Sequence, residues 1–354
     1  MSDRVHLLAL DREALASLLA DLGQPRFRVD QVHDWIHAKR VADFDAMRNV
    51  PKALRAALAA RADLRTLEPL EHRTSRDGLT EKWLFRTADG HGVETVLIRD
   101  RDSDRRTVCV SSALGCPLGC RFCASAEGPY VRPLAPGEMV EQVARVADLA
   151  GEAATNVVFM GTGEPFLAYD EVLAAARRLN AEDGFGIGAR HITVSTVGVI
   201  PGIERFAAEP EDFRLAISLH APTQTAREKI IPAARRWPLG RLLGVVRRFT
   251  RERRREVTFE YILIDGFNAH VHDADRLAEQ LRDIPCKVNC IPFNPVPGGA
   301  WTPPARDTCR AFVARIEQHG LRATLRTEKG ADIQAACGQL RARRLCRTPT
   351  NKEE

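Results

Sequence analysis

The stretch GCPLGCRFC, residues 115–123, places three cysteines at spacings of four and three in a loop that also holds two glycines. It follows TVCVSS, residues 107–112, which has the composition of a buried strand. Thiolates are soft ligands that select zinc, Cu(I) or an iron–sulfur cluster. The next histidine is the distant His191, so a closed zinc site is not indicated. The pattern favours an iron–sulfur cluster with one open iron, and a zinc site or a redox-active cluster remain alternatives. The three cysteines are Cys116, Cys120 and Cys123.

Strand and helix patterns alternate six times from this stretch onward. The predicted strands are rich in Val and Ile with little polar alternation, as strands buried on both faces are. They are 107–112, 155–161, 191–198, 214–221, 256–264 and 287–293. The predicted helices are 137–150, 170–180, 201–208, 238–250, 272–284 and 307–320.

Six strand–helix units predict an α/β fold with right-handed parallel crossovers. Six units fit an incomplete (β/α)6 barrel better than the full eight, and a doubly wound open sheet is the alternative. In both architectures the chemistry lies at the carboxyl ends of the strands.

The rest of the chain predicts smaller units around this barrel. Val29, Val32 and Ile36, with Trp35, repeat at helical spacing, so residues 1–70 are predicted to be a helical accessory domain that contacts RNA. Short extended runs predict a β linker, and the last residues carry a basic tail. The predicted divisions are 1–70, 71–106, 107–330 for the barrel and 331–354 for a C-terminal extension.

Composition limits the function classes. The chain has 354 residues, 44% of them hydrophobic, which suits one catalytic domain and a satellite. Its N-terminus is charged too early for a secretory signal, and no run approaches the roughly 18 apolar residues of a membrane span. We therefore predict a cytoplasmic protein without membrane contact. The net charge of +5 is mild, but arginine runs at 235–237, 251–256 and 341–347 allow an RNA partner, although such runs are also typical of solvated helix faces.

The cysteine spacing on the first strand–helix loop resembles the radical S-adenosylmethionine (radical SAM) superfamily. The resemblance implies a [4Fe–4S] cluster whose open iron is chelated by S-adenosylmethionine, and reductive cleavage to a 5′-deoxyadenosyl radical. The segment VVFMGTGEP, residues 157–165, is similar to the glycine-rich acidic segment that meets the amino group of the cofactor. Polar residues that end later strands form one rim. The implied cofactor-binding residues are Gly163, Glu164, Ser195, Ser218, Leu219, His220 and Asn294.

Seven motifs, spread over nearly the whole chain, are similar to the RlmN and Cfr family of 23S ribosomal RNA adenine methyltransferases. The motifs are FRVDQVHDWIHAKRVADFDAM, GVETV, CVSSALGCPLGCRFC, GTGEP, SLHAP, NPVPG and AACGQL, at 27–47, 92–96, 109–123, 161–165, 218–222, 294–298 and 335–340. The resemblance implies methylation of C2 of an adenosine in the peptidyl-transferase centre of 23S rRNA. It further implies tRNA as a candidate second substrate, and two molecules of S-adenosylmethionine per turnover.

The family resemblance also implies roles for three residues outside the cluster. Cys337 would take a methyl group, lose a hydrogen atom from it to the deoxyadenosyl radical, and attack the adenine with the resulting methylene radical. Cys109 would then form a transient disulfide with Cys337 to release the product, and Glu94 would be the general base. We predict that the other cysteines are small buried hydrophobic residues. They are Cys286, Cys290, Cys309 and Cys346.

The chain departs from the family pattern at three places. ASAEGPYVRPL, residues 124–134, stands where a sequence like STAQQGF is expected. Ala331 and Gln334 replace common aspartates, and Thr162 replaces a methionine. These changes flank the residues of the implied chemistry and remove none of them, so they bear on the target atom and the RNA.

Three alternatives stay open at this point. One is Cfr-type methylation at C8, and another is a diverged radical enzyme with a substrate other than RNA. The third is a metal-stabilised RNA-binding protein without catalysis. For the enzyme, we expect an electron donor such as flavodoxin or ferredoxin, and a monomeric state.

Overall fold

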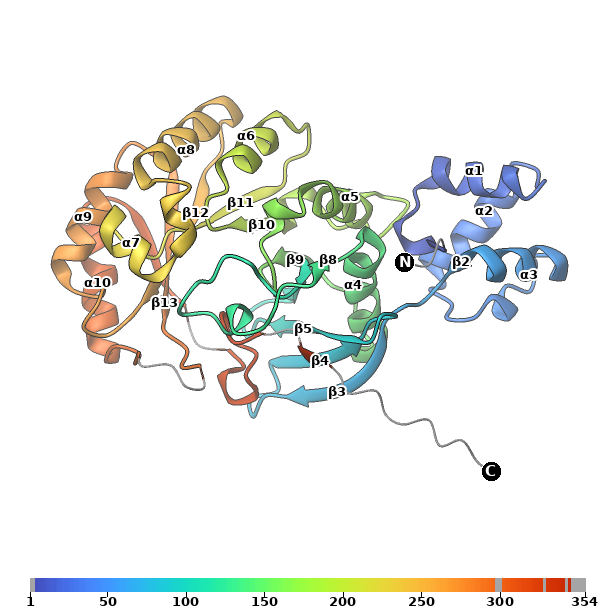
Figure 1. The fold of residues 1–354 in the computed structure, drawn as a ribbon, viewed down its shortest axis with the longest axis horizontal. Helices are drawn as coiled ribbons and strands as arrows, with labels where there is room; N and C mark the ends of the chain where they lie inside the picture. Colours follow the sequence, from blue (N-terminus) through green and yellow to red (C-terminus); the bar gives the residue numbers. More distant parts are fainter. Residues whose placement is uncertain (1–3, 297–300, 327–328, 341–342, 345–354) are drawn as a thin grey trace.

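Eleven strands form one sheet in the computed structural model, which describes residues 4–296, 301–326, 329–340 and 343–344 (Figure 1). Seven of these strands are parallel, and their order in space follows their order in the chain. They are β6 (Arg106–Cys109), β9 (Asn156–Phe159), β10 (Ile192–Thr196), β11 (Arg214–Ser218), β12 (Val257–Leu263), β13 (Cys286–Pro292) and β14 (Arg322–Leu325). The six predicted strands are confirmed, and β14 is a seventh that the sequence patterns do not predict.

The strand order decides between the two predicted architectures. A doubly wound sheet needs a point where the order reverses, because that reversal puts helices on both faces. Here the order does not reverse, so every right-handed crossover places its helix on the same side. The sheet is also open, since β14 pairs only with β13 within the described part of the chain. The incomplete barrel is therefore confirmed.

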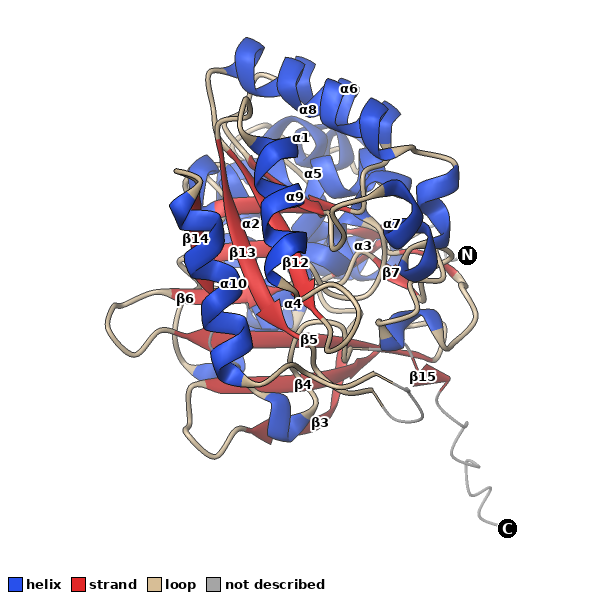
Figure 2. Ribbon diagram, turned by 90° about the vertical axis from the view of Figure 1, so that its left-hand side faces the viewer, coloured by secondary structure: helices blue, strands red, loops and turns tan. Residues whose placement is uncertain are grey.

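The crossover helices cover the outer side of the sheet, as Figure 2 shows for α9 and α10 in front of β12 and β13. All six predicted helices form. They are α4 (Pro136–Ala150), α5 (Tyr169–Asn180), α6 (Ile200–Ala208), α8 (Leu239–Arg253), α9 (Val271–Leu281) and α10 (Arg306–Gln318), joined by the short α7 (Gln224–Ile230).

The segment predicted as a β linker continues the barrel sheet. β3 (Glu68–Thr74), β4 (Thr80–Arg86) and β5 (His91–Arg99) pair antiparallel with one another, and β5 pairs with β6. The register places Val96 opposite Cys109. Residues near the GVETV motif therefore lie beside the strand that leads into the cysteine loop.

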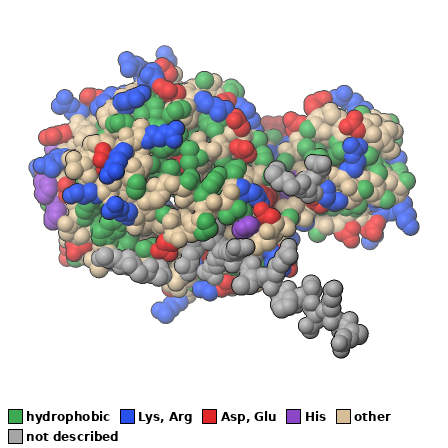
Figure 3. Space-filling view, in the orientation of Figure 1, with side chains coloured by type: hydrophobic (Ala, Val, Ile, Leu, Met, Phe, Trp, Pro, Cys, Tyr) green, Lys and Arg blue, Asp and Glu red, His purple; other side chains and the backbone are tan. Residues whose placement is uncertain are grey.

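The N-terminal residues form a smaller lobe beside the main body (Figure 3). α1 (Arg12–Asp21), α2 (Arg28–His33) and α3 (Lys52–Arg61) lie with two short parallel strands, β1 (Val5–His6) and β2 (Ala62–Asp63). Glu141 of α4 ties this lobe to the barrel, since its carboxylate lies 2.9 Å from His6 Nε2 and accepts the N–H of Thr66 at 2.7 Å. The exact domain boundaries stay a prediction.

Candidate active site

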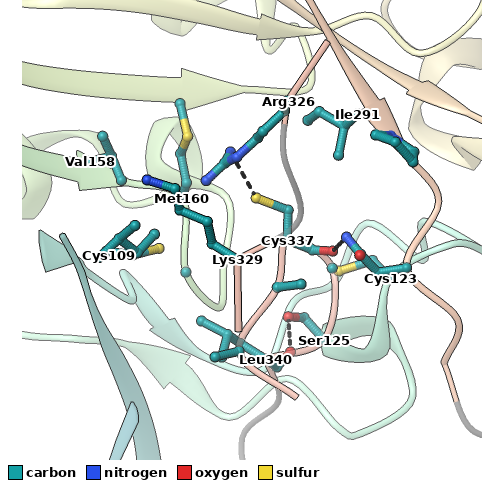
Figure 4. Close-up of a pocket in the computed structure, with 17 residues that line it drawn as sticks. Cys109, Cys123, Ser125, Val158, Met160, Ile291, Arg326, Lys329, Cys337 and Leu340 are labelled. Carbon is teal, nitrogen blue, oxygen red and sulfur yellow. Dashed lines mark hydrogen bonds between the residues drawn. The ribbon is translucent and has the colours of Figure 1, made fainter. Parts of the chain in front are cut away.

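Two neighbouring cavities open at the carboxyl ends of the parallel strands. The first, which we call the three-cysteine cavity, is lined by Cys116, Cys120, Cys123, Gly163, Glu164, Ser195, Ser218 and His220, among others. The second, the Cys109 cavity, is lined by Cys109, Asn294, Lys329 and Cys337, among others (Figure 4). The two share a wall made of Cys123, Ser125, Met160, Gly161, Ile291, Arg326, Cys337 and Gly338. Cys337 therefore faces both spaces.

The three cluster cysteines follow β7 (Ala113–Leu114) in the loop that the sequence predicts. Burial raises the pKa of Cys116 to about 12 and also raises those of Cys120 and Cys123, because a buried thiolate loses its hydration and lies near other anionic groups, although Arg227 partly opposes the rise at Cys120. Among the described residues, no three His, Cys, Asp or Glu side chains lie close enough together to bind a single metal ion. Three soft ligands around one cavity, with Cys120 buried and Cys116 and Cys123 partly exposed, fit an iron–sulfur cluster, whose cysteines sit at separate corners.

Arg227 is a fully buried cation beside this cavity, and the sequence patterns do not predict it. Its guanidinium donates to the carbonyls of Val197, Ser218 and Leu219, the last at 3.2 Å. Burial lowers the Arg227 pKa to about 10, and Cys120 is the group that opposes this change. Arg227 thus joins the ends of β10 and β11 and places positive charge near the cysteine loop.

The GTGEP segment brings backbone and a carboxylate to the cavity. Gly163 has φ of +115°, and a Cβ there would lie 2.5 Å from Ser112 Oγ, so only glycine fits. The next residue, Glu164, accepts the N–H of Val197 at 2.9 Å and that of Phe166 at 3.1 Å. Burial raises its pKa to about 7. The loop therefore holds a desolvated carboxyl group in a defined position.

The predicted rim residues divide between the two cavities. Ser195, Ser218 and His220 line the three-cysteine cavity. Burial lowers the His220 pKa to about 3, so the ring is neutral, and its Nδ1 accepts the N–H of Ile262 at 3.1 Å. Leu219 is buried and lies outside the described lining of both cavities. Asn294 lines only the Cys109 cavity.

Cys109 and Cys337 meet in the second cavity although they lie far apart in the sequence (Figure 4). Both are unpaired thiols in this structure. Burial raises the pKa of Cys109 to about 12, and the nearby Cys337 adds to the rise. Arg326 Nη1 donates a hydrogen bond to Cys337 Sγ at 3.1 Å. Cys337 is therefore the thiol of this pair that has a cationic partner.

The segment that departs from the family pattern holds the loop that carries Cys337. The N–H of Ala124 donates to the carbonyl of Gly338 at 2.7 Å, and Ser125 Oγ donates to that of Leu340 at 2.6 Å. Asn294 Nδ2 donates to the Cys337 carbonyl at 3.2 Å from the other side. ASAEG thus contributes a docking surface for the C-terminal loop.

Glu94 lies close to this loop but does not line either cavity within the described residues. Its side chain is buried, and Lys82 Nζ lies 3.2 Å from Glu94 Oε1. The same Nζ donates to the carbonyl of Gln334 at 2.9 Å. Lys82 therefore links the candidate base to the Cys337 loop, and its only sequence signal is a lysine among the apolar residues of β4.

Other sequence predictions have plain outcomes. Cys286, Cys290 and Cys309 are buried as predicted, whereas Cys346 lies outside the described residues.

Arg326, Lys329 and the buried Glu260 line the site without having been predicted. A charged residue within or just after a strand is the signal that could have found them.

Comparison with known proteins agrees with this geometry. Residues 5–64 match the ribosomal RNA large subunit methyltransferase N-terminal domain, and residues 110–278 match the radical SAM superfamily. The crystal structure of a radical SAM methyltransferase from Sphaerobacter thermophilus is 45% identical, with a TM-score of 0.92, and the match covers 95% of this chain and 99% of that one.

Two curated relatives are similar over nearly their whole length. The dual-specificity RNA methyltransferase RlmN of Alkalilimnicola ehrlichii is 44% identical over 95% of this chain and 93% of its own. The probable dual-specificity RNA methyltransferase RlmN of Symbiobacterium thermophilum is 44% identical over 96% and 92%.

The fold and the three-cysteine cavity define a radical SAM enzyme, a class that uses a [4Fe–4S] cluster and S-adenosylmethionine. Within this class the chain belongs to the RlmN family of RNA methyltransferases. The alternative of a non-catalytic RNA-binding protein is therefore wrong, and so is that of a radical enzyme with a substrate other than RNA. Among the described residues, no helix is long and apolar enough to cross a membrane.

Proposed function

We propose that the protein methylates C2 of an adenosine in the peptidyl-transferase centre of 23S rRNA, and an adenosine of tRNA, through an S-methyl group on Cys337. The position of Cys337 on the wall between the two cavities carries this proposal. A group there can receive a methyl from one cavity and deliver it into the other. The relatives' shared name, dual-specificity RNA methyltransferase, supports two RNA substrates and favours C2 over the Cfr-type C8 reaction.

In this proposal the three-cysteine cavity holds both cofactors. Cys116, Cys120 and Cys123 hold the cluster. When bound, the cofactors supply an electrophilic methyl group and a carbon radical able to abstract hydrogen. Glu164 pairs with the amino group of S-adenosylmethionine, since a buried carboxylate and an ammonium form a strong charge-assisted contact. The other proposed contacts are Gly163, Ser195, Ser218 and His220 in this cavity, and also Leu219 and Asn294, which lie outside its described lining.

The Cys109 cavity takes the adenine. The Cys337 thiolate accepts the methyl group, and after loss of a hydrogen atom the methylene carbon adds to the ring. The ring carbon then loses its proton to Glu94, Cys109 forms a bond to the Cys337 sulfur, and the carbon–sulfur bond breaks. The freed carbon takes a proton and becomes the methyl group, and the surplus electron would return to the cluster that the three cysteines hold. An electron-donor protein later reduces the disulfide with two electrons.

Binding of S-adenosylmethionine should depend on pH near neutrality. Because the Glu164 pKa is raised to about 7, affinity should increase from about pH 6 to about pH 8 as the carboxylate forms. Glu164→Gln should weaken binding about 10- to 100-fold at pH 8 and flatten this dependence. Calorimetric titration of cluster-loaded protein measures both, with the exposed Glu182→Gln as the control. A pH-dependent affinity in Glu164→Gln like that of the wild type would contradict the assignment.

The same raised pKa acts on stability in the opposite direction. The folded protein keeps a proton on Glu164 that the unfolded chain loses above its ordinary pKa of 4.5. The contribution to stability of the ligand-free protein is therefore full below about pH 4.5 and is lost as pH rises through about 7.

The arginine run 251–256 is a proposed contact for the RNA backbone. Arg254, Arg255 and Glu256 line a hollow at the amino ends of the parallel strands, together with Arg190 and Arg214. Six cations and two carboxylates line it. Its excess of four positive charges is close to the whole chain's +5. Asp212 is shared by several of these arginines, lying 3.6 Å from Arg190 and 3.9 Å from Arg253.

Removing two exposed cations from this hollow should weaken RNA binding without changing its sequence preference. Arg190→Ala/Arg254→Ala should reduce the magnitude of the slope of log affinity against log salt by about 1 to 2. A protein that contacts fewer phosphates releases fewer counterions from the RNA when it binds. Filter binding of an rRNA fragment at several salt concentrations measures the slope. Arg276→Ala/Arg282→Ala, in α9 and directly after its end, is the matched control, and equal slopes in both variants would contradict the contact.

Nucleoside mass spectrometry tests the proposed function. RNA from a strain that lacks the gene should lose 2-methyladenosine from 23S rRNA and tRNA, and the purified enzyme should restore it from labelled S-adenosylmethionine. Loss of 8-methyladenosine would instead favour the C8 reaction. Unchanged 2-methyladenosine, with no second enzyme present, would overturn the proposal. The proposal includes a cytoplasmic monomer that takes electrons from a flavodoxin or ferredoxin.

A further inference from the structure

We propose that Arg326 is a positioning residue that holds the Cys337 sulfur as a thiolate, aimed for methyl transfer. This inference rests on the proposed function of Cys337 as methyl carrier. Figure 4 shows the Arg326 side chain reaching from the end of β14 to the sulfur, and Nη1 lies 3.1 Å from Sγ. The Arg326 backbone is fixed as well, because its N–H donates to the carbonyl of Cys290 at 2.8 Å.

The surroundings of Cys337 make such a partner necessary. Only a thiolate attacks the methyl group, and a free cysteine ionises near pH 8.5. Burial disfavours thiolates here, since it raises the pKa of the neighbouring Cys109 to about 12. Cys123, on the shared wall, has its pKa raised as well. A protonated guanidinium in direct contact compensates the charge that this environment would otherwise exclude.

The charges around Arg326 agree with this role. Contact with Cys337 is the largest cause of the raised Arg326 pKa, ahead of the contributions from Glu260 and Cys109. Glu260 has a different hydrogen-bond partner, since its Oε2 accepts from Asn289 Nδ2 at 2.7 Å. Arg326 therefore stays charged, and the Cys337 sulfur is the group that its guanidinium contacts directly.

The proposed methyl transfer to the Cys337 sulfur needs no base, because no proton moves during the transfer. The sulfur lone pair forms the bond to the methyl carbon, and the electron pair of the broken carbon–sulfonium bond leaves with the departing thioether. Arg326 keeps its proton throughout. The new thioether carries no charge, so the charge-assisted contact ends and the S-methyl group is released to turn toward the adenine.

Lys329 provides a matched control, because it is a second cation on the wall of the same cavity. Its Nζ donates to the carbonyl of Arg99 at 3.0 Å and lies 3.6 Å from Asp100. Lys329 thus adds positive charge to the cavity while engaging other groups, and comparison of the two variants separates direct contact with sulfur from general electrostatics.

The test measures S-methylation of Cys337 in the cluster-loaded enzyme, without RNA or reductant, using methyl-labelled S-adenosylmethionine and peptide mass mapping. Arg326→Gln should be about 10- to 100-fold slower at pH 7 and should recover as pH rises through about 8.5. The methylation rate of Arg326→Lys should lie between those of the wild type and Arg326→Gln. Lys329→Gln should keep the wild-type pH dependence. An Arg326→Gln variant with the wild-type rate and pH dependence would overturn the proposal.

A second measurement uses the wild-type protein and therefore does not depend on whether the Arg326 variants fold. Wild-type protein, loaded with cluster before any S-adenosylmethionine is added, is treated with iodoacetamide across pH, and alkylation of Cys337 is mapped. Fast reaction already at about pH 7 supports the proposal, whereas a rate that rises only through about pH 8.5 overturns it. If wild-type Cys337 takes no methyl group at any pH, the proposed function fails, and the alkylation result still decides the role of Arg326.

Discussion

Cys337→Ala should lose RNA methylation, with the yield of methylated adenosine falling by at least about 10³-fold, because the covalent carrier of the methyl group is gone. The cluster ligands and Glu164 are untouched, so reductive cleavage of S-adenosylmethionine should continue. Transfer of label to RNA and release of 5′-deoxyadenosine, measured in the same reaction, separate the two activities.

A cysteine with only a packing role is the control for this variant. Cys286 is buried in β13 and lies outside the described lining of both cavities, so Cys286→Ala should keep methylation. Methylation by Cys337→Ala at a rate near the wild type would show that the methyl group reaches RNA without this carrier.

Cys109→Ala should stop the reaction one step later and leave RNA covalently bound to the protein. Cys109 lines the same cavity as Cys337, where it can reach the sulfur that joins protein and adenine. Without Cys109, no thiol attacks the Cys337 sulfur to break its bond to the methylene carbon. Turnover should therefore fall by at least about 10³-fold. Labelled RNA that migrates with the protein on a denaturing gel measures the adduct.

This adduct should depend on Cys337, so the double variant Cys109→Ala/Cys337→Ala should form none. Cys290→Ala, a buried cysteine of β13, should turn over without accumulating adduct. Multiple turnovers by Cys109→Ala with no bound RNA would show that another group releases the product.

Local sequence patterns predicted most of the barrel. Six strands and six helices were predictable because each strand lies in a mostly apolar run with Val or Ile and each helix repeats at 3.6 residues. β14 was missed because its sequence, RATL, holds neither Val nor Ile and is flanked by charge, with Arg322 at its start and Arg326 directly after it. Local patterning cannot reveal a strand whose stability comes from pairing with β13.

The departures from the family pattern became interpretable only in three dimensions. ASAEG lies next to the three cysteines in sequence, where it was expected to bear on the target atom and the RNA. In the structure Ala124 and Ser125 form hydrogen bonds with the loop that carries Cys337. Gln334, another departure, has φ of +55° and offers its carbonyl to Lys82, so the backbone makes this contact.

The sequence by itself determined the three-cysteine motif, the order of strands and helices, and the family, because these follow from spacing, periodicity and motifs along the chain. Only the tertiary structure decided that Cys337 stands between two cavities, that Arg326 contacts its sulfur, and that Lys82 lies between Glu94 and the Cys337 loop. The reason is physical. A charge acts over a few ångströms of space, and residues that are distant in the chain become neighbours only when the sheet and the C-terminal loop have folded together.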